Sequence, residues 1–375
     1  MKIAIFHNFL DNIGGAEIVD LIMARELGAD IYTTNIDREK IKRMGFGTAN
    51  IFSIGKVPIN APFRQEVAYW RFRHLNLGRK YDFYIVSADW AVGATRHHHP
   101  NLWYVFSPIR EIFDMREFTR ENMVVKWKRP IFDFWAEWKK KSVISDAKRA
   151  DKIISISKNV QNRVKKYLGR ESKIIYPPIE TKKYHYRKNG DFWLSVNRLI
   201  NHKRVDMQIK AFAKMPEEKL IIVGSYEQQP CFRNYAAYIK KIKPDNVEIK
   251  SWVSQEELIE LYADCRGFIT ASQDEDFGLT PLEAMASGKP VIAPNEGGYK
   301  ETIINGANGR LIDDISEDKI IEAVREINKN PVSYREACQK QTKKFDLAIF
   351  IDKVKQEIKE LHSHDRKNNH IDSQL

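Results

Sequence analysis

The first half of the chain alternates short apolar runs with longer stretches of helical periodicity. Residues 2–7 form an apolar run that predicts a strand, and Gly14 and Gly15 precede a helical pattern over 16–27. Further strands are expected at 31–33, 83–86, 102–105 and 152–156. Alternating strands and helices are typical of a parallel sheet, so residues 1–178 are expected to form one α/β domain.

The pattern breaks near residue 177 and resumes after a polar stretch. Residues 179–191 are basic and without periodicity, which is typical of an interdomain linker. A second series of strands is expected at 192–196, 220–224, 247–249, 267–270 and 290–293. Residues 192–345 therefore predict a second α/β domain, followed by a helix over 346–361 and a disordered tail over 362–375.

Composition narrows the class of protein. A chain of 375 residues with 43% hydrophobic and 30% charged residues is long enough for two globular domains with their own cores. No apolar run approaches the roughly 20 residues that cross a bilayer, and residues 1–9 are too short for a signal peptide. The net charge of +12 favours an anionic partner, whether nucleic acid, acidic lipid or a phosphorylated substrate.

The three cysteines are far apart and form no CxxC pair, which argues against a disulfide framework or a structural zinc site. A reducing cytoplasm is the expected compartment. The cysteines are Cys231, Cys265 and Cys338.

The segment 272–286 carries the most chemistry. It follows an expected strand and passes through a glycine turn into a helix, whose first turn suits Pro281. A helix starting near Leu279 would direct the N–H groups of Gly278, Leu279 and Thr280 toward the carboxyl edge of the sheet, where the helix dipole favours phosphate. The segment therefore predicts a phosphate-binding site.

Two acids flank this expected site, Glu275 before the helix and Glu283 within it. A carboxylate accepts hydrogen bonds from paired hydroxyls, so the two suit a sugar on one side and a ribose on the other. Taken by themselves, two glutamates near a helix start are more often solvated surface acids. The surrounding residues favour the functional interpretation.

These acids and their neighbours closely resemble the donor-site signature of glycosyltransferase family 4. The matching residues are Glu275, Phe277, Gly278, Leu279, Glu283, 284–286, Gly288, 290–293, Gly297 and Gly298. The resemblance implies a retaining enzyme with the GT-B fold, two Rossmann-like βα domains facing a central cleft. It also implies that Glu275 contacts the donor sugar and Glu283 the ribose of a nucleoside diphosphate. The family usually has glycine after the first glutamate, whereas this chain has Asp276.

Further donor-binding residues follow from the same resemblance. Arg198 and Lys203 match a pair of cations after the first strand of the second domain, and two cations there would neutralise a diphosphate leaving group. Trp252 and Val253 lie where family members hold the base through backbone groups, although Trp252 also suits a packing role. Phe277 belongs to the implied donor site as well.

The first domain offers residues for a phosphate or an acceptor. Gly14 and Gly15 allow close approach of a ligand to the backbone. Residues 104–110 resemble a subgroup of the family that usually has histidine where this chain has Phe106, and that retains the arginine found here as Arg110. His98, in a run of three histidines, is a candidate to supply an imidazole instead.

No metal or cofactor is expected. Asp274 and Asp276 have the spacing of an Asp-x-Asp metal motif, but they fall inside the glutamate signature. The family does not normally need a metal, since arginine, lysine and a helix terminus supply the charge stabilisation.

Residues 126–141 combine indoles and phenyl rings with lysines and arginines. This mixture suits an anionic membrane interface, and it equally suits a helix whose aromatics pack into the first domain. Nucleic-acid binding is not expected, because no recognised binding module accompanies the charge.

The predicted function is transfer of a hexose from a nucleoside-diphosphate sugar to a hydroxyl of a glycan or lipid-linked acceptor. GDP-mannose is the first candidate for the donor. The alternatives are a non-catalytic nucleotide-sugar or anionic-glycan binding protein of the same fold and a sugar-phosphate synthase. The expected location is the cytoplasm, including a peripheral position at the inner face of the membrane.

Overall fold

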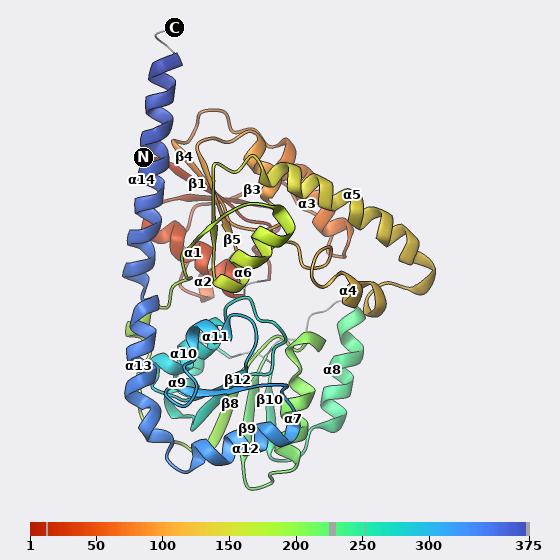
Figure 1. Cartoon of the computed structure of the whole chain (residues 1–375), viewed down its shortest axis with the longest axis vertical. Helices are drawn as coiled ribbons and strands as arrows, with labels where there is room; N and C mark the ends of the chain where they lie inside the picture. The colour runs from red at the N-terminus through yellow and green to blue at the C-terminus, as the bar shows by residue number, and fades with distance from the viewer. Residues whose placement is uncertain (13, 225–229, 252, 373–375) are drawn as a thin grey trace. The chain divides into compact units, whose positions relative to one another are not determined.

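The computed structural model describes residues 1–12, 14–224, 230–251 and 253–372 (Figure 1). The described chain divides into two compact units. The first comprises Met1–Pro177 and Phe350–Leu375, and the second comprises Pro178–Ile349. The division falls one residue before the start of the expected linker at 179, and the linker residues belong with the second unit.

The first unit is built on a parallel sheet of seven strands in the order β3-β2-β1-β4-β5-β6-β7. The strands are β1 Ile3–Phe6, β2 Asp30–Thr33, β3 Ile51–Ser53, β4 Phe83–Val86, β5 Asn101–Val105, β6 Lys152–Ser155 and β7 Lys173–Ile174. Every residue of β1, β4 and β5 is buried, because helices cover a parallel sheet on both faces. Continuous apolar strands of this kind explain why the sequence pattern predicted them.

The helices of the first unit connect these strands. They are α1 Gly15–Leu27, α2 Arg38–Arg43, α3 Phe63–His74, η1 Val92–Arg96, α4 Arg116–Asn122, η2 Lys126–Lys128, α5 Arg129–Ala147, α6 Lys158–Arg163 and η3 Val164–Leu168.

The second unit has a parallel six-stranded sheet in the order β10-β9-β8-β11-β12-β13. Its strands are β8 Phe192–Val196, β9 Lys219–Val223, β10 Val247–Lys250, β11 Gly267–Ile269, β12 Val291–Pro294 and β13 Gly309–Ile312. Its helices are η4 Thr181–Lys183, η5 Asn201–Lys203, α7 Val205–Ala213, α8 Pro230–Ile242, α9 Gln255–Asp264, α10 Leu279–Ala286, α11 Tyr299–Thr302, α12 Glu317–Asn328, η6 Pro331–Tyr334, α13 Arg335–Thr342 and η7 Lys343–Phe345. Two parallel sheets confirm the prediction of two Rossmann-like domains.

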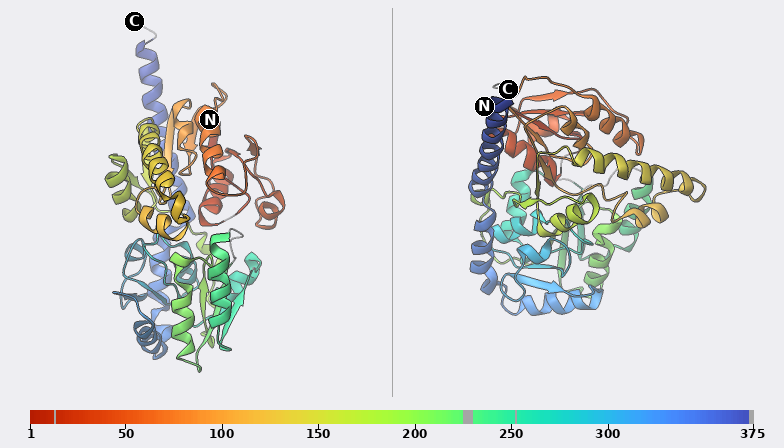
Figure 2. Two further views of the ribbon diagram at one scale, coloured as in Figure 1. Left: turned by 90° about the vertical axis from the view of Figure 1, so that its right-hand side faces the viewer. Right: turned by 45° about the horizontal axis from the view of Figure 1, so that its top comes forward.

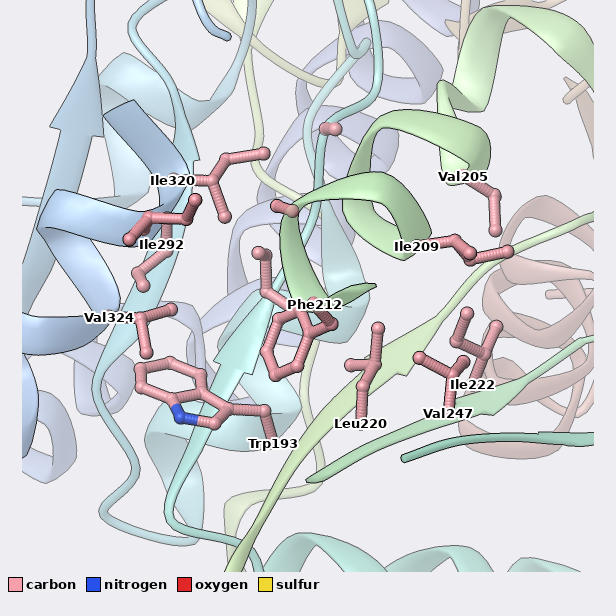
Figure 3. Close-up of a cluster of buried hydrophobic side chains, with 14 of the residues drawn as sticks. Trp193, Val205, Ile209, Phe212, Leu220, Ile222, Val247, Ile292, Ile320 and Val324 are labelled. Atoms are coloured by element: carbon pink, nitrogen blue, oxygen red, sulfur yellow. The ribbon is translucent and has the colours of Figure 1, made fainter. Parts of the chain in front are cut away.

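Helices α7, α8 and α12 cover one face of the second sheet through a single apolar core. Phe212 of α7 and Val324 of α12 lie against Trp193 of β8 at its centre (Figure 3). A side chain at Gly267 would meet the Trp193 ring at 2.6 Å, so the neighbouring strand needs glycine there. Removing the Phe212 ring would cost about 3–5 kcal/mol of unfolding free energy, the usual range for a buried phenylalanine.

The last helix, α14 Leu347–Asp372, is shared between the units (blue in Figures 1 and 2). Its carboxylate Glu357, only 1% exposed, forms ion pairs with Lys152 and Lys173 of the first unit. The helix extends past residue 361, where the sequence predicted a disordered tail. Once a helix is nucleated, each further residue adds a backbone hydrogen bond, so polar residues continue it without a core of their own.

Among the described residues, no helix is both long enough and apolar enough to span a bilayer.

Candidate functional site

The candidate site lies at the carboxyl edge of the second sheet. Strands β8, β11 and β12 are neighbours and run parallel, so the loops that follow them meet at one edge. The loop after β8 leads to Lys203, the loop after β11 carries Glu275, and the loop after β12 carries Gly297 and Gly298. Three segments far apart in the sequence thus contribute to one place.

Lys203 and Glu275 form the central ion pair. Lys203 Nζ donates to Glu275 Oε2 at 2.5 Å, and their side chains are 14% and 20% exposed. Burial by itself would raise the pKa of Glu275, but the charge and hydrogen bond of Lys203 outweigh it and lower the pKa to about 2. Glu275 is therefore a carboxylate at any physiological pH.

The backbone around this pair is held by Arg204, the residue next to Lys203. Arg204 has a left-handed backbone (φ 47°), and its guanidinium donates to Ala271 O at 2.7 Å and to Glu296. Gln273 N also donates to His202 O at 2.8 Å. These contacts fix the loop after β8 against the loop after β11.

Gly297 and Gly298 allow the loop after β12 to lie directly on the Glu275 backbone. Gly298 N donates to Glu275 O at 2.8 Å. A side chain at Gly297 would meet Glu275 O at 2.5 Å, and one at Gly298 would meet Phe277 Cα at 2.5 Å. The glycine pair is therefore required by packing against the acidic loop.

Tyr299, at the start of α11, was not singled out from the sequence. It is 2% exposed, and its hydroxyl hydrogen-bonds with Thr270 Oγ1 at 2.9 Å and with Glu275 Oε2 at 3.4 Å. Tyr299 and Lys203 thus contact the same carboxylate oxygen. An aromatic residue directly after the glycine pair was the signal available in the sequence.

Helix α10 begins at Leu279, as expected, with Gly278 as its N-terminal cap in a left-handed conformation (φ 93°). No side chain caps this terminus. A side chain at Gly278 would meet the Tyr299 ring at 2.8 Å, so packing and backbone both require glycine. The first N–H groups of a helix have no acceptor within it, so those of Leu279 and Thr280 suit an anion.

Phe277 does not face this anion site. Its ring is 2% exposed and packs edge-on against Phe345 at 5.5 Å between centroids. The Phe277 side chain therefore belongs to the core. Burial stabilises an apolar ring more than contact with a polar ligand would.

Glu283, on α10, has a different environment from Glu275. Tyr262 Oη donates to Glu283 Oε2 at 2.8 Å. Burial raises the pKa of Glu283, and hydrogen bonds from Tyr262 and Tyr184 oppose this without overcoming it. The two acids thus differ in their partners. Lys203 stabilises the ionised form of Glu275, whereas Glu283 accepts hydrogen bonds from tyrosine hydroxyls.

The remaining expected donor-binding residues are Arg198, Trp252 and Val253. Arg198 is exposed in the loop after β8 and Val253 is half-buried between β10 and α9. Trp252 lies outside the described residues.

At the carboxyl edge of the first sheet, the loop that precedes α1 is anchored by Glu17. Gly14 N donates to Glu17 Oε2 at 2.8 Å, and Gly15 begins α1. His7, at the end of β1, contacts Glu17 at 3.3 Å and Asp20 at 2.5 Å. Burial would lower the pKa of His7, but these carboxylates outweigh it and raise the pKa to about 10.

Asn8 and Asp89 lie beside this cluster and were missed in the sequence. Asn8 Nδ2 donates to Asp89 Oδ1 at 2.7 Å. Burial, together with the charge of Glu111, raises the pKa of Asp89 to about 7. Both follow strands that end at this edge, β1 and β4, which was the signal the sequence offered.

The two expected acceptor residues differ in outcome. Arg110 lies in the loop after β5, with its guanidinium 2.8 Å from Asp114.

His98 is fully buried before β5, at the opposite edge of the sheet. Its Nδ1 contacts Ala94 O at 2.8 Å, and its Nε2 accepts a hydrogen bond from Leu77 N at 3.1 Å. Burial lowers its pKa to about 4. An acceptor role for His98 is therefore excluded, because packing between Phe6 and Tyr84 takes the ring into the core.

Within the described part of the chain, no three histidine, cysteine or acidic side chains are grouped as metal ligands. Cys265 and Cys338 are buried and free.

Residues 178–345 match the model of a family described as Glycosyl transferases group 1. The chain is 28% identical over 182 residues to an uncharacterized glycosyltransferase of Methanocaldococcus jannaschii, covering 48% of this chain and 50% of that protein. It is 25% identical to alpha-1,3/1,6-mannosyltransferase ALG2 of Candida glabrata, covering 81% and 78%. It is 32% identical to a probable sucrose-phosphate synthase of Thermosipho melanesiensis, covering 46% and 43%.

The chain spans about half the length of the first of these relatives, the glycosyltransferase of Methanocaldococcus jannaschii. Among solved structures, the fold is similar to that of Anabaena HepE in complex with UDP and glucose, with a TM-score of 0.75, 18% identity and coverage of 96% of this chain and 99% of that chain. The chain has the GT-B fold, as its sequence predicted.

Proposed function

We propose that this protein is a retaining glycosyltransferase of family 4 that transfers a hexose from a nucleoside-diphosphate sugar to a hydroxyl group. The observation that carries the proposal is the Lys203–Glu275 ion pair, joined through one loop to the uncapped start of α10. Together they offer an ammonium and unpaired N–H groups to a diphosphate, and a carboxylate to sugar hydroxyls.

The diphosphate is assigned to Lys203, Arg198 and the N–H groups of Leu279 and Thr280. A lysine ammonium has three donors, so Lys203 can keep its bond to Glu275 while it contacts a phosphate. Negative charge grows on the diphosphate as it departs, and groups already oriented toward it stabilise that transition state most. No cofactor or metal is needed for this stabilisation.

The sugar is assigned to Glu275 and the ribose to Glu283. Glu275 is ionised and acts only as an acceptor, which suits two neighbouring hydroxyls. Tyr262 and Tyr184 hold the Glu283 carboxyl in one orientation, so it needs no charge partner to meet the ribose. Asp276 is one residue from Glu275 and adds a further carboxylate near the sugar.

In the proposed reaction, the bond between the anomeric carbon and the phosphate oxygen breaks, and its electron pair stays on the phosphate. The acceptor oxygen bonds to the anomeric carbon on the same face, and the acceptor proton passes to a phosphate oxygen. The configuration at the anomeric carbon is therefore retained.

The acceptor is assigned to the first unit, where Gly14, Asn8, Asp89 and Arg110 follow strands at the carboxyl edge. A glycan or lipid-linked acceptor at the cytoplasmic face of the membrane is proposed. GDP-mannose is the first candidate donor, supported by the likeness to a mannosyltransferase over most of the chain. A sugar-phosphate synthase is the alternative that the likeness to sucrose-phosphate synthase supports.

The test begins with thermal shifts in GDP-mannose, UDP-glucose and ADP-glucose, since a ligand that binds only the folded state raises the melting temperature. The donor that binds is then incubated with simple acceptors, and the anomeric configuration of the product is determined by NMR. Retained configuration supports the proposal. Binding without turnover or donor hydrolysis would favour the non-catalytic alternative, and an inverted product would contradict the mechanism.

A further inference from the structure

Helix α5 and the short helix η2 before it carry large apolar side chains on their outer side. Trp127, Ile131, Phe134 and Trp138 are 70%, 64%, 78% and 51% exposed. Their spacing of four, three and four residues places them along one helix face. We call these four residues the outer stripe. They do not pack into the domain, which was one of the two interpretations of this segment.

The opposite face of α5 accounts for its packing. Ala136, Lys139 and Val143 are buried. Trp135 Nε1 and Lys139 Nζ donate to the two oxygens of Glu66 on α3, at 2.8 and 2.6 Å. Because this inner face already attaches the helix to the fold, the outer stripe is not needed for it.

The charges beside the outer stripe are predominantly positive. Two of the three acids of α5, Asp133 and Glu137, are neutralised by Arg116, and Arg120 also pairs with Asp133. The third, Asp146, is buried on the inner face. In contrast, Lys126, Lys128 and Lys141 are exposed and have no ion pair in the described part of the chain. Aromatic side chains are thus bordered by uncompensated ammonium groups.

The apolar surface continues from α5 to α3. Trp138 and Trp70, the latter 60% exposed, line one cavity of about 380 Å³. The cavity is also lined by Arg73 and Arg96, whose side chains are 26% and 22% exposed and pair with the buried Asp146. The two tryptophans therefore extend the exposed aromatic surface from α5 to α3, while the charge of the two arginines is balanced in part by Asp146.

We propose that the outer stripe and its lysines dock this protein on an anionic phospholipid bilayer. Indole and phenyl rings enter the boundary between headgroups and acyl chains, and lysines are attracted to the negative surface. A second copy of this chain fits the surface less well, because a symmetric contact would bring the lysines of both copies together. This inference goes beyond the proposed function and does not depend on it.

The experiment measures binding of the full protein to vesicles by co-sedimentation. Vesicles of phosphatidylglycerol and phosphatidylcholine in equal parts should bind the protein, and pure phosphatidylcholine should bind it at least about tenfold less. The double substitution Trp127→Ser and Phe134→Ser should lower binding about tenfold or more with an unchanged melting temperature. Lys126→Glu with Lys128→Glu should lower it similarly, and added salt should then have less effect.

The matched control removes exposed apolar side chains elsewhere, with Tyr238→Ser and Val332→Ser in the second unit, 40% and 49% exposed. These should leave binding unchanged. The proposal is overturned if the Trp127 and Phe134 variant binds like the unaltered protein, or if vesicle charge has no effect. It is also overturned if sedimentation velocity shows a dimer that the variant dissociates, since a second copy would then cover the stripe.

Discussion

Lys203 Nζ lies 2.5 Å from Glu275 Oε2, although 72 residues of sequence separate them. The pair joins the loop after β8 to the loop after β11, and Tyr299, which directly follows the loop after β12, contacts the same carboxylate oxygen. One oxygen atom thus connects three strand ends. Substitutions at these residues should alter the charge or the orientation of the Glu275 carboxylate. Matched control variants separate these effects from a general loss of stability.

Lys203→Ala should lower kcat/KM for transfer by about a hundredfold or more, because it removes a cation that stabilises the departing diphosphate. Steady-state kinetics with the donor found by thermal shift will measure this. Lys214→Ala is the matched control, since Lys214 is half exposed and pairs with Glu317 on α12, away from the site. A Lys203 variant with near-normal kinetics would exclude the assigned phosphate role.

Lys203→Met should also change the dependence of stability on pH. The folded pKa of Glu275 lies below the ordinary value of 4.5, at about 2, so its stabilisation is present above pH 4.5 and is lost as the pH falls toward 2. The variant should be less stable at neutral pH by about 2 kcal/mol. Urea unfolding at several pH values should show this difference shrinking in acid. A difference independent of pH would contradict the ionised pair.

Gly297→Ala should damage the site more than its backbone strain alone explains. Gly297 and Gly306 both have positive φ, 60° and 79°, but only a side chain at Gly297 meets other atoms, at 2.5 Å. Gly306→Ala should cost about 1–2 kcal/mol of unfolding free energy. Gly297→Ala should cost more and weaken donor binding, as measured by unfolding and titration calorimetry. Equal effects of the two substitutions would argue against packing of this turn on Glu275.

Tyr299→Phe should affect both stability and turnover. It removes the hydroxyl that contacts Thr270 and Glu275, at a cost of about 1 kcal/mol for the lost hydrogen bond. Because Glu275 then loses a neighbour that restricts its orientation, kcat/KM should fall several-fold. Tyr235→Phe provides the comparison: it removes a 2.7 Å hydrogen bond to Asp206 and should lower stability without this kinetic effect.

Glu283→Gln should stabilise the protein at neutral pH, because it removes the cost of ionising a half-buried carboxyl whose pKa is raised. The sign follows from linkage: such a group favours folding below its ordinary pKa and disfavours it as the pH rises through the folded value. The gain should therefore disappear in acid. At the same time, nucleotide binding should weaken if Glu283 contacts the ribose. Unfolding and nucleotide titration separate the two effects.

The strands and the start of α10 could be predicted because each depends on local residues. Buried parallel strands are continuous apolar runs, and Gly278 followed by Pro281 marks a turn into a helix. The loops after β8 and β11 lie at the same edge of the sheet because the two strands are parallel neighbours. Sequence thus located the region of the candidate site.

Side-chain partners could not be predicted in the same way. His98 was expected near an acceptor because of its residue type, yet rings from β1 and β4 enclose it. Phe277 lies within the signature, yet it packs against a residue 68 positions later, Phe345. Tyr299 contacts Glu275 across a turn whose shape depends on two glycines. Each of these outcomes depends on contacts between distant segments, which periodicity does not encode.

Helix α14 has a consequence for biosynthesis. The second unit is one continuous stretch, so it can fold as soon as Ile349 has left the ribosome. The first unit is interrupted by it, and Lys152 and Lys173 receive their buried partner Glu357 only when the chain has grown 184 residues beyond Lys173. The domain made first is therefore completed last, and during that interval it must persist in the cell without its final helix.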